Sequence, residues 1–174
     1  MTTKYVYNLT FTFIACLFSL IRSDSVVLGL NCLDLLRNNK QVNKSREGIR
    51  VAIAAMEDAA TNSEWNFMNK LRLLEAEQLT LTRDHWRAIN KYDASIESAK
   101  KAGFIHEQGL ACEKAGFYFK NLDRNNKKAL EYFKQACECF KEWGSSVKVD
   151  FIQKEIDSLN ERERDSLDVK EGSK

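Results

Sequence analysis

The chain has 174 residues, of which 44% are apolar and 30% charged, and this is enough to bury the core of one domain. It contains no proline, whereas average usage of about 5% would give roughly nine, and proline interrupts helix interiors. The composition therefore favours long helices joined by short turns. The net charge of +2 is too small for a nucleic-acid-binding surface, which excludes nucleic acid as a partner.

An uncharged, mostly apolar run covers residues 5–21, and three interpretations of it stay open. With Lys4 before it and Ser23 and Ser25 after it, the run resembles a signal peptide and its cleavage site. Its length also reaches the lower limit of about 17–25 residues for a membrane-spanning helix. A helix buried in the fold agrees better with the polar residues inside the run. Residues 1–22 are therefore a hydrophobic helix, either buried or serving as a signal peptide or anchor.

Helical periodicity continues through residues 23–160, the predicted helical-repeat domain. Apolar residues spaced by three and four predict helices over 24–37, 46–61, 64–81, 85–102, 104–121, 127–143 and 146–160, with a polar loop at 38–45. Because the links are short, sequential helices should be antiparallel. Residues 161–174 alternate charge signs and hold few apolar residues, which predicts a disordered tail.

Two of these helices repeat one pattern at a spacing of 41 residues. Its members are Ala88, Tyr92, Ala99 and Gly103 in the first copy, and Ala129, Phe133, Phe140 and Gly144 in the second. Small residues beside an aromatic one suit a helix that packs closely on a neighbour, and the glycine suits its C-terminal end. A period in this range indicates a helical repeat, where each helix pair buries its apolar face against the next. The predicted fold class is all-α, with antiparallel helix pairs stacked in succession.

Motifs for catalysis, cofactor binding or metal binding are absent from the sequence. His106-Glu107 could begin a zinc-protease motif, but Leu110 occupies the position where a second histidine must stand. His106 is therefore expected at the surface or an interface. No Gly-rich loop precedes a Lys-Ser or Lys-Thr pair, as a phosphate-binding loop requires. We expect a non-enzymatic protein with no catalytic residue, cofactor or metal.

Sulfur and indole side chains are expected in the core. The cysteines at positions 16, 32, 112, 137 and 139 have neither metal-ligand nor disulfide-framework spacing, so buried reduced thiols are predicted. Trp65, Trp86 and Trp143 lie at predicted helix ends or on predicted packing faces. For each of them a core position is favoured over a ligand cage.

Four stretches resemble one region of large signalling proteins, the multi-sensor hybrid kinases. They are Tyr92-Asp-Ala-Ser-Ile96, Ala102-Gly-Phe-Ile-His-Glu-Gln-Gly-Leu-Ala111, Ala115-Gly-Phe-Tyr-Phe119, and Trp143-Gly144 with Lys148-Val149. In those proteins an AAA-type ATPase domain is followed by tetratricopeptide-like helices, a GAF sensor and a histidine-kinase module. The resemblance covers about residues 50–157. It implies a short tetratricopeptide-like right-handed superhelix and a connecting or regulatory role, but not the ATPase or kinase activities, whose motifs this chain lacks.

The function expected from these observations is a cytoplasmic protein-interaction module in signal transduction, either a fragment or a stand-alone relative of that kinase linker region. A groove lined by the helices 64–81 and 104–121 would receive a protein or peptide partner. The candidate groove residues are Lys70, Arg72, Glu113, Lys114 and Lys120. The alternative is a membrane-anchored or secreted helical protein that uses residues 1–25 as anchor or signal.

Overall fold

A computed structural model describes residues 24–171 of the chain, and the apolar run at 5–21, with its three interpretations, lies outside the described residues. The described part is all-α, as predicted, and contains no strand. A helix over residues 24–37 (the 24–37 helix) is followed by α2 (Val42–Asn62), α3 (Glu64–Leu81), α4 (His85–Ala102), α5 (Ile105–Tyr118), the π-helical turn η1 (Phe119–Asp123), α6 (Asn126–Trp143) and α7 (Ser146–Glu171). Among these helices, none is both long enough and apolar enough to cross a membrane.

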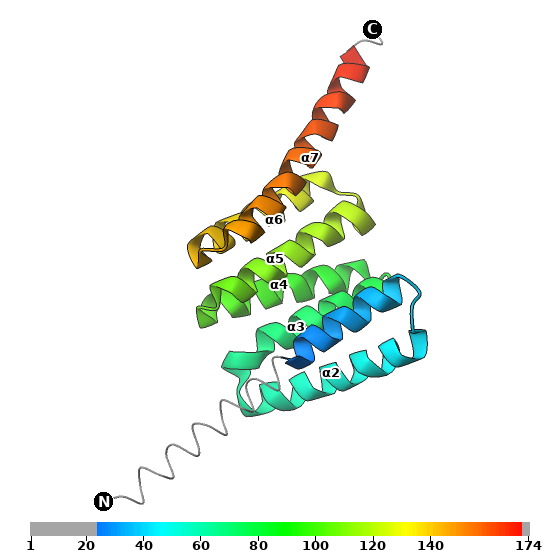
Figure 1. The fold of residues 1–174 in the computed structure, drawn as a ribbon, viewed down its shortest axis with the longest axis vertical. Helices are drawn as coiled ribbons and strands as arrows, with labels where there is room; N and C mark the ends of the chain where they lie inside the picture. Colours follow the sequence, from blue (N-terminus) through cyan, green and yellow to red (C-terminus); the bar gives the residue numbers. More distant parts are fainter. Residues whose placement is uncertain (1–23, 172–174) are drawn as a thin grey trace, which may run out of the picture.

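The helices stack in chain order, from α2 at one end to α7 at the other (Figure 1). The packing is most extensive between α3 and α4 and between α5 and α6, while α4 and α5 share a smaller contact. The chain therefore divides into hairpin-like pairs that lie one on the next. The distal turns of α7 project beyond the stack (Figure 1).

Three element boundaries differ from the predicted ones. The loop predicted at 38–45 is shorter, because α2 already begins at Val42 and the buried Ser45 hydroxyl donates to the Lys40 carbonyl at 3.3 Å. The helix predicted at 104–121 is α5 followed by the wider turn η1. Residues 161–171, predicted as part of a disordered tail, continue α7 as helix, in a stretch without the glycine or proline that would end it.

The repeat at 41-residue spacing is confirmed in α4 and α6. All six of its non-glycine residues are buried, with at most 2% of each exposed. The two glycines cap their helices in the left-handed conformation, Gly103 at φ 72° and Gly144 at φ 83°. At the N-terminal ends, the side chains of Asp84 and Asn125 accept hydrogen bonds from backbone N–H groups three residues on.

Buried apolar side chains form two clusters, and α3 contributes to both. One side of α3, including Leu71 and Leu74, packs with the 24–37 helix and α2. The other side, including Leu73 and Ala76, packs with α4, α5, α6 and α7. Gly29 allows a close helix contact in the first cluster, because a Cβ atom there would lie 2.7 Å from Leu74 Cδ2. The helix α3 thus joins the N-terminal part of the stack to the rest.

The cysteine prediction is confirmed for four of the five cysteines, while Cys16 lies outside the described residues, and the tryptophan prediction is wrong. The four cysteines in the described residues are buried and free. Trp65, Trp86 and Trp143 are instead 62%, 75% and 52% exposed. On α4 the buried stripe begins at Ala88, so a residue two positions earlier points to the opposite side of the helix. Trp143 stacks on the ring of the exposed His106, with the centroids 5.2 Å apart.

Candidate functional site

Four of the five predicted groove residues form ion pairs between alternate helices of the stack. These alternate helices, the 24–37 helix, α3, α5 and α7, are called the first helices below. Lys70 of α3 lies 2.7 Å from Glu107 of α5. Lys148 of α7 lies 2.7 Å from Glu113 of α5, a glutamate that is only 6% exposed. These pairs connect one helix pair to the next.

Lys114 and Lys120, the other two lysines among the five predicted groove residues, also form ion pairs with a neighbouring element. Lys114 of α5 lies 3.9 Å from Asp34 on the 24–37 helix. Lys120 of η1 pairs with Glu155 of α7. The charges selected from the sequence therefore lie along one face of the stack, but most of them are neutralised by a neighbouring helix of the same chain.

Arg72 is not part of this series. Its guanidinium donates to the Ala94 carbonyl at 3.2 Å and to the Ser98 hydroxyl, both on α4. The structure therefore places Arg72 against the second helix of its own pair and separates it from the other four candidates.

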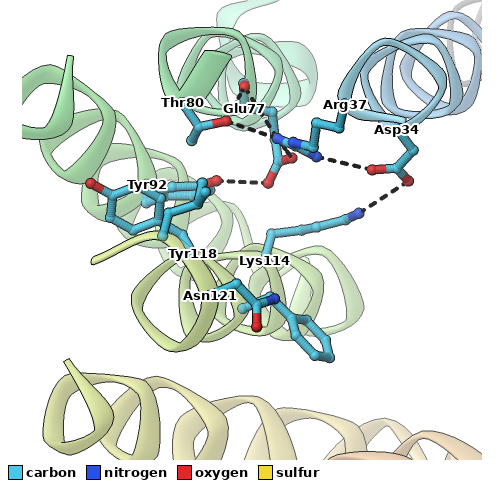
Figure 2. A pocket seen from close by; sticks show the side chains of 10 residues that line it. Asp34, Arg37, Glu77, Thr80, Tyr92, Lys114, Tyr118 and Asn121 are labelled. Carbon is cyan, nitrogen blue, oxygen red and sulfur yellow. Dashed lines mark hydrogen bonds and ion pairs between the residues drawn. The ribbon is translucent and has the colours of Figure 1, made fainter. Parts of the chain in front are cut away.

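A cleft opens where the 24–37 helix, α3 and α5 converge (Figure 2). Its inner part has a volume of about 280 Å³. The lining residues are Asp34, Arg37, Glu77, Thr80, Tyr92, Lys114, Phe117, Tyr118, Asn121 and Leu122. Of the five predicted groove residues, this cleft includes only Lys114.

Glu77 is the centre of a buried polar network at the wall of the cleft (Figure 2). It is 2% exposed and accepts a hydrogen bond of 2.6 Å from Arg37 Nη2 and one of 2.7 Å from the Tyr92 hydroxyl. Arg37 also donates to the Thr80 hydroxyl at 2.9 Å and to Asp34 at 2.9 Å. One carboxylate thus links the 24–37 helix, α3 and α4.

The electrostatics of the network keep Arg37 charged and Tyr92 neutral. Burial, reinforced by the Glu77 carboxylate, raises the pKa of Tyr92 well above its ordinary value of 10. Burial opposes the charge of Arg37, but the attraction and hydrogen bond of Glu77 outweigh it and raise the Arg37 pKa. A buried carboxylate of this kind is stabilised only while its partners are present.

The outer part of the cleft is larger, at about 630 Å³, and extends over the turns after α3 and η1. It shares Arg37, Thr80, Asn121 and Leu122 with the inner part. The further lining residues are Leu36, Leu81, Arg83, His85 and Arg124. His85 Nδ1 is held 2.6 Å from the Tyr118 hydroxyl.

Sequence reasoning missed the residues that line this outer part, although a signal for them exists. Leu81 and Leu122 are separated by 41 residues, and so are Arg83 and Arg124. Extending the repeat back from α4 and α6 into the preceding turns would have paired them. Arg37 and Glu77 carry no comparable signal, because neither takes part in a periodic pattern.

Within residues 24–171, no group of three or more His, Cys, Asp or Glu side chains could hold a metal ion. No protein-family model matches the sequence, and neither a curated protein nor a solved structure gives a significant match. The resemblance to the helical region of hybrid kinases therefore stays a prediction.

Proposed function

We propose that this chain is a non-enzymatic helical-repeat module, with a short tetratricopeptide-like right-handed superhelix, that binds a protein or peptide partner. The partner lies along the face made by the first helices. The observation that carries the proposal is the cleft on this face, where three helices and two turns enclose cavities of about 280 and 630 Å³. Concave sites between helices are where ligands of all-α proteins usually bind.

The ion pairs between first helices support this role because they hold the face in one arrangement. Lys70–Glu107, Lys148–Glu113 and Lys120–Glu155 each join two elements that are neighbours along the face. Partly buried pairs of this geometry restrict sliding between helix pairs, so the partner would meet a preformed surface. Preformed sites lose less conformational entropy on binding.

The signalling context of the proposal comes from the resemblance of residues 50–157 to hybrid-kinase linkers. In that context the module is cytoplasmic and connects or regulates other domains, as a fragment or as a stand-alone relative.

Site-specific crosslinking tests the proposal. A photoreactive phenylalanine analogue replaces Asn121, which is exposed at the junction of the two cavities. The matched control carries the same analogue at Lys100, an exposed position on α4. We expect a discrete crosslinked partner, identified by mass spectrometry, from the Asn121 variant only. The same products from both positions would contradict the proposal.

A second test separates binding from folding. Lys114→Gln removes the one predicted groove charge that lines the cleft, and its only described ion pair is the long one to Asp34. We expect weaker capture of the crosslinked partner with an unchanged melting temperature. A parallel fall in melting temperature and capture would show that Lys114 acts through the fold. Lys120 is less suitable, because it pairs with Glu155.

A further inference from the structure

The turn after α3 and the turn after η1 present the same residues to one cavity. The outer cavity of about 630 Å³ is lined by Leu81, the last residue of α3, with Arg83 of the following turn, and by Leu122 of η1 with Arg124, which follows η1. Each pair of equivalent residues is separated by the repeat spacing of 41. We call these four residues, together with Leu36, the turn pocket. The same short segment, Leu-x-Arg, thus contributes to the cavity from two successive helix pairs.

The lining of the turn pocket is cationic. Among the side chains that the structure describes, those that line the outer cavity include three arginines and no carboxylate. Arg37 is committed to Glu77 and Asp34, whereas Arg83 and Arg124 form no ion pair with another described side chain. The acidic neighbour Asp84 is already used, as the cap of α4 and the partner of Arg87 at 3.5 Å. Two guanidinium groups are thus available to an anion, and a guanidinium binds a carboxylate through two parallel hydrogen bonds.

The backbone at both arginines is in the left-handed region, with φ of 58° at Arg83 and 53° at Arg124. Glycine or asparagine adopts this conformation at lower cost than a long side chain. The two helix C-termini at Gly103 and Gly144 do use glycine. The arginines are therefore placed at a conformational cost in both turns.

The floor of the turn pocket is apolar. Leu36 and Leu81 are half-buried at the edge of the N-terminal core cluster. Leu122, which lines the same cavity, is 50% exposed. An apolar side chain of a ligand would cover all three. A free inorganic anion would leave them in water.

From this combination we propose that the turn pocket binds an acidic peptide segment in which carboxylates flank a leucine-like side chain. One carboxylate pairs with Arg83, another with Arg124, and the apolar side chain between them packs on the leucine floor. This rests on the proposed function and names the chemical class of its partner.

Fluorescence polarisation tests the proposal, with a short labelled peptide of alternating Asp, Leu and Glu as the probe and the full chain as the receptor. We expect Arg83→Gln and Arg124→Gln each to weaken binding by about tenfold. The matched control is Arg87→Gln, which removes the same charge from a side chain outside the pocket that is 70% exposed. It should leave the affinity unchanged. A probe with Asn and Gln in place of the acids should not bind.

Two further binding measurements exclude other kinds of ligand for the turn pocket. A probe with Ser in place of Leu should bind about tenfold more weakly, because the floor then stays exposed. Millimolar inorganic phosphate should compete poorly for the same reason. The proposal is overturned if the Asn and Gln probe binds equally well, or if phosphate displaces the acidic probe completely. The free chain could instead form a dimer through this pocket. The proposal is also overturned if the chain dimerises, if Arg83→Gln and Arg124→Gln abolish the dimer, and if the acidic probe does not dissociate it.

A doubly substituted chain keeps the test independent of folding and of the proposed function. Arg83→Gly with Arg124→Gly removes both charges and suits the left-handed backbone, so the fold is retained. We expect it to lose the acidic probe. If crosslinking from Asn121 to a partner persists undiminished in this variant, the partner binds the face but not through the turn pocket. That result would overturn the present inference and leave the proposed function standing.

Discussion

The α3–α4 pair and the α5–α6 pair share one repeat pattern but join their two helices by different chemistry. At the equivalent position, α4 has Tyr92, whose hydroxyl donates to the buried Glu77 of α3. In α6 the residue is Phe133, which packs on Gly116 of α5, where an added Cβ would lie 2.5 Å from the ring. One pair is held by a polar network and the other by an aromatic ring on a glycine.

The difference shows which part of the repeat is tied to the cleft. The polar contact reaches a third helix, since Glu77 also binds Arg37 of the 24–37 helix and so forms the cleft wall. The apolar contact lies within a single pair and makes only local packing. A repeat can therefore keep one burial pattern and one set of caps while the chemistry at a single buried position decides whether a further helix is recruited.

Of the substitutions that test this comparison, removal of the buried Glu77 carboxylate should change the stability most. Glu77→Ala leaves Arg37 and Tyr92 without their buried partner, and we expect a loss of about 3–5 kcal/mol in the free energy of unfolding. Urea denaturation measures it. The control Glu47→Ala breaks an exposed pair with Arg50 and should leave the midpoint unchanged. A small effect of Glu77→Ala would mean that the network does not hold the first two pairs together.

Exchanging the two aromatic residues tests whether the pairs are interchangeable. Tyr92→Phe removes a hydrogen bond to a charged group and should cost about 1.5–3 kcal/mol. Phe133→Tyr places a hydroxyl in the apolar contact with Gly116 and should cost about 1–3 kcal/mol if the hydroxyl is left unpaired. Thermal and urea denaturation give both values. If Phe133→Tyr is neutral, the α5–α6 contact accepts polarity and the contrast between the pairs is weaker than the structure indicates.

The pH dependence of stability gives a second measure of the same difference. Because the Tyr92 pKa is higher in the folded chain than its unfolded value of about 10, its contribution is complete below pH 10 and is lost as the pH rises further. We expect wild-type stability to fall above pH 10, with a further contribution from Tyr132, whose pKa burial also raises. Tyr92→Phe should reduce that slope by about one proton, or about 1.4 kcal/mol per pH unit. An unchanged slope would contradict a buried, neutral Tyr92.

The glycine caps should behave alike in the two pairs. Gly103 and Gly144 have positive φ, and a Cβ atom added at either residue would meet no atom of another part of the chain within 4 Å. Substitution by alanine therefore adds backbone strain alone, which we expect to cost about 1–2 kcal/mol at each site. Asparagine, which tolerates the left-handed region, is the matched control and should cost less. Unequal losses would show that the two caps differ beyond their backbone conformation.

The smallest effect should have the opposite sign. Arg83→Gly and Arg124→Gly relieve the left-handed strain, and we expect each to raise the free energy of unfolding by up to about 1 kcal/mol. The same substitutions should weaken binding of the acidic probe. Stability and affinity measured on one preparation check both results. A loss of stability would mean that the arginine side chains contribute to the fold.

Local features of the chain were predictable, because they depend on neighbours within a few residues. The bounds predicted for the third and fourth helices, 64–81 and 85–102, are those of α3 and α4. The glycine caps and the buried stripe of the repeat are confirmed for the same reason. The tryptophans were misplaced because indole size favours burial on average, whereas the register of the stripe decides the side on which each one lies.

The candidate site could be predicted only in part. Lys114 was selected and does line the cleft, but Lys70, Glu113 and Lys120 are occupied by ion pairs with other helices. Long charged side chains reach partners on neighbouring helices, and the sequence spacing between such partners follows no period. Pairing of this kind depends on the relative placement of helices.

The sequence by itself determined that residues 24–160 are mostly helical, where most of these helices end, and which face of each repeat helix is buried. These follow from periodicity and from the backbone preferences of glycine and of capping side chains. The tertiary structure alone decided that Arg37 meets Glu77, and that the two turn arginines share one cavity. The physical reason is distance along the chain: contacts between residues about forty apart depend on how the helix pairs stack, and that stacking is a property of the whole core.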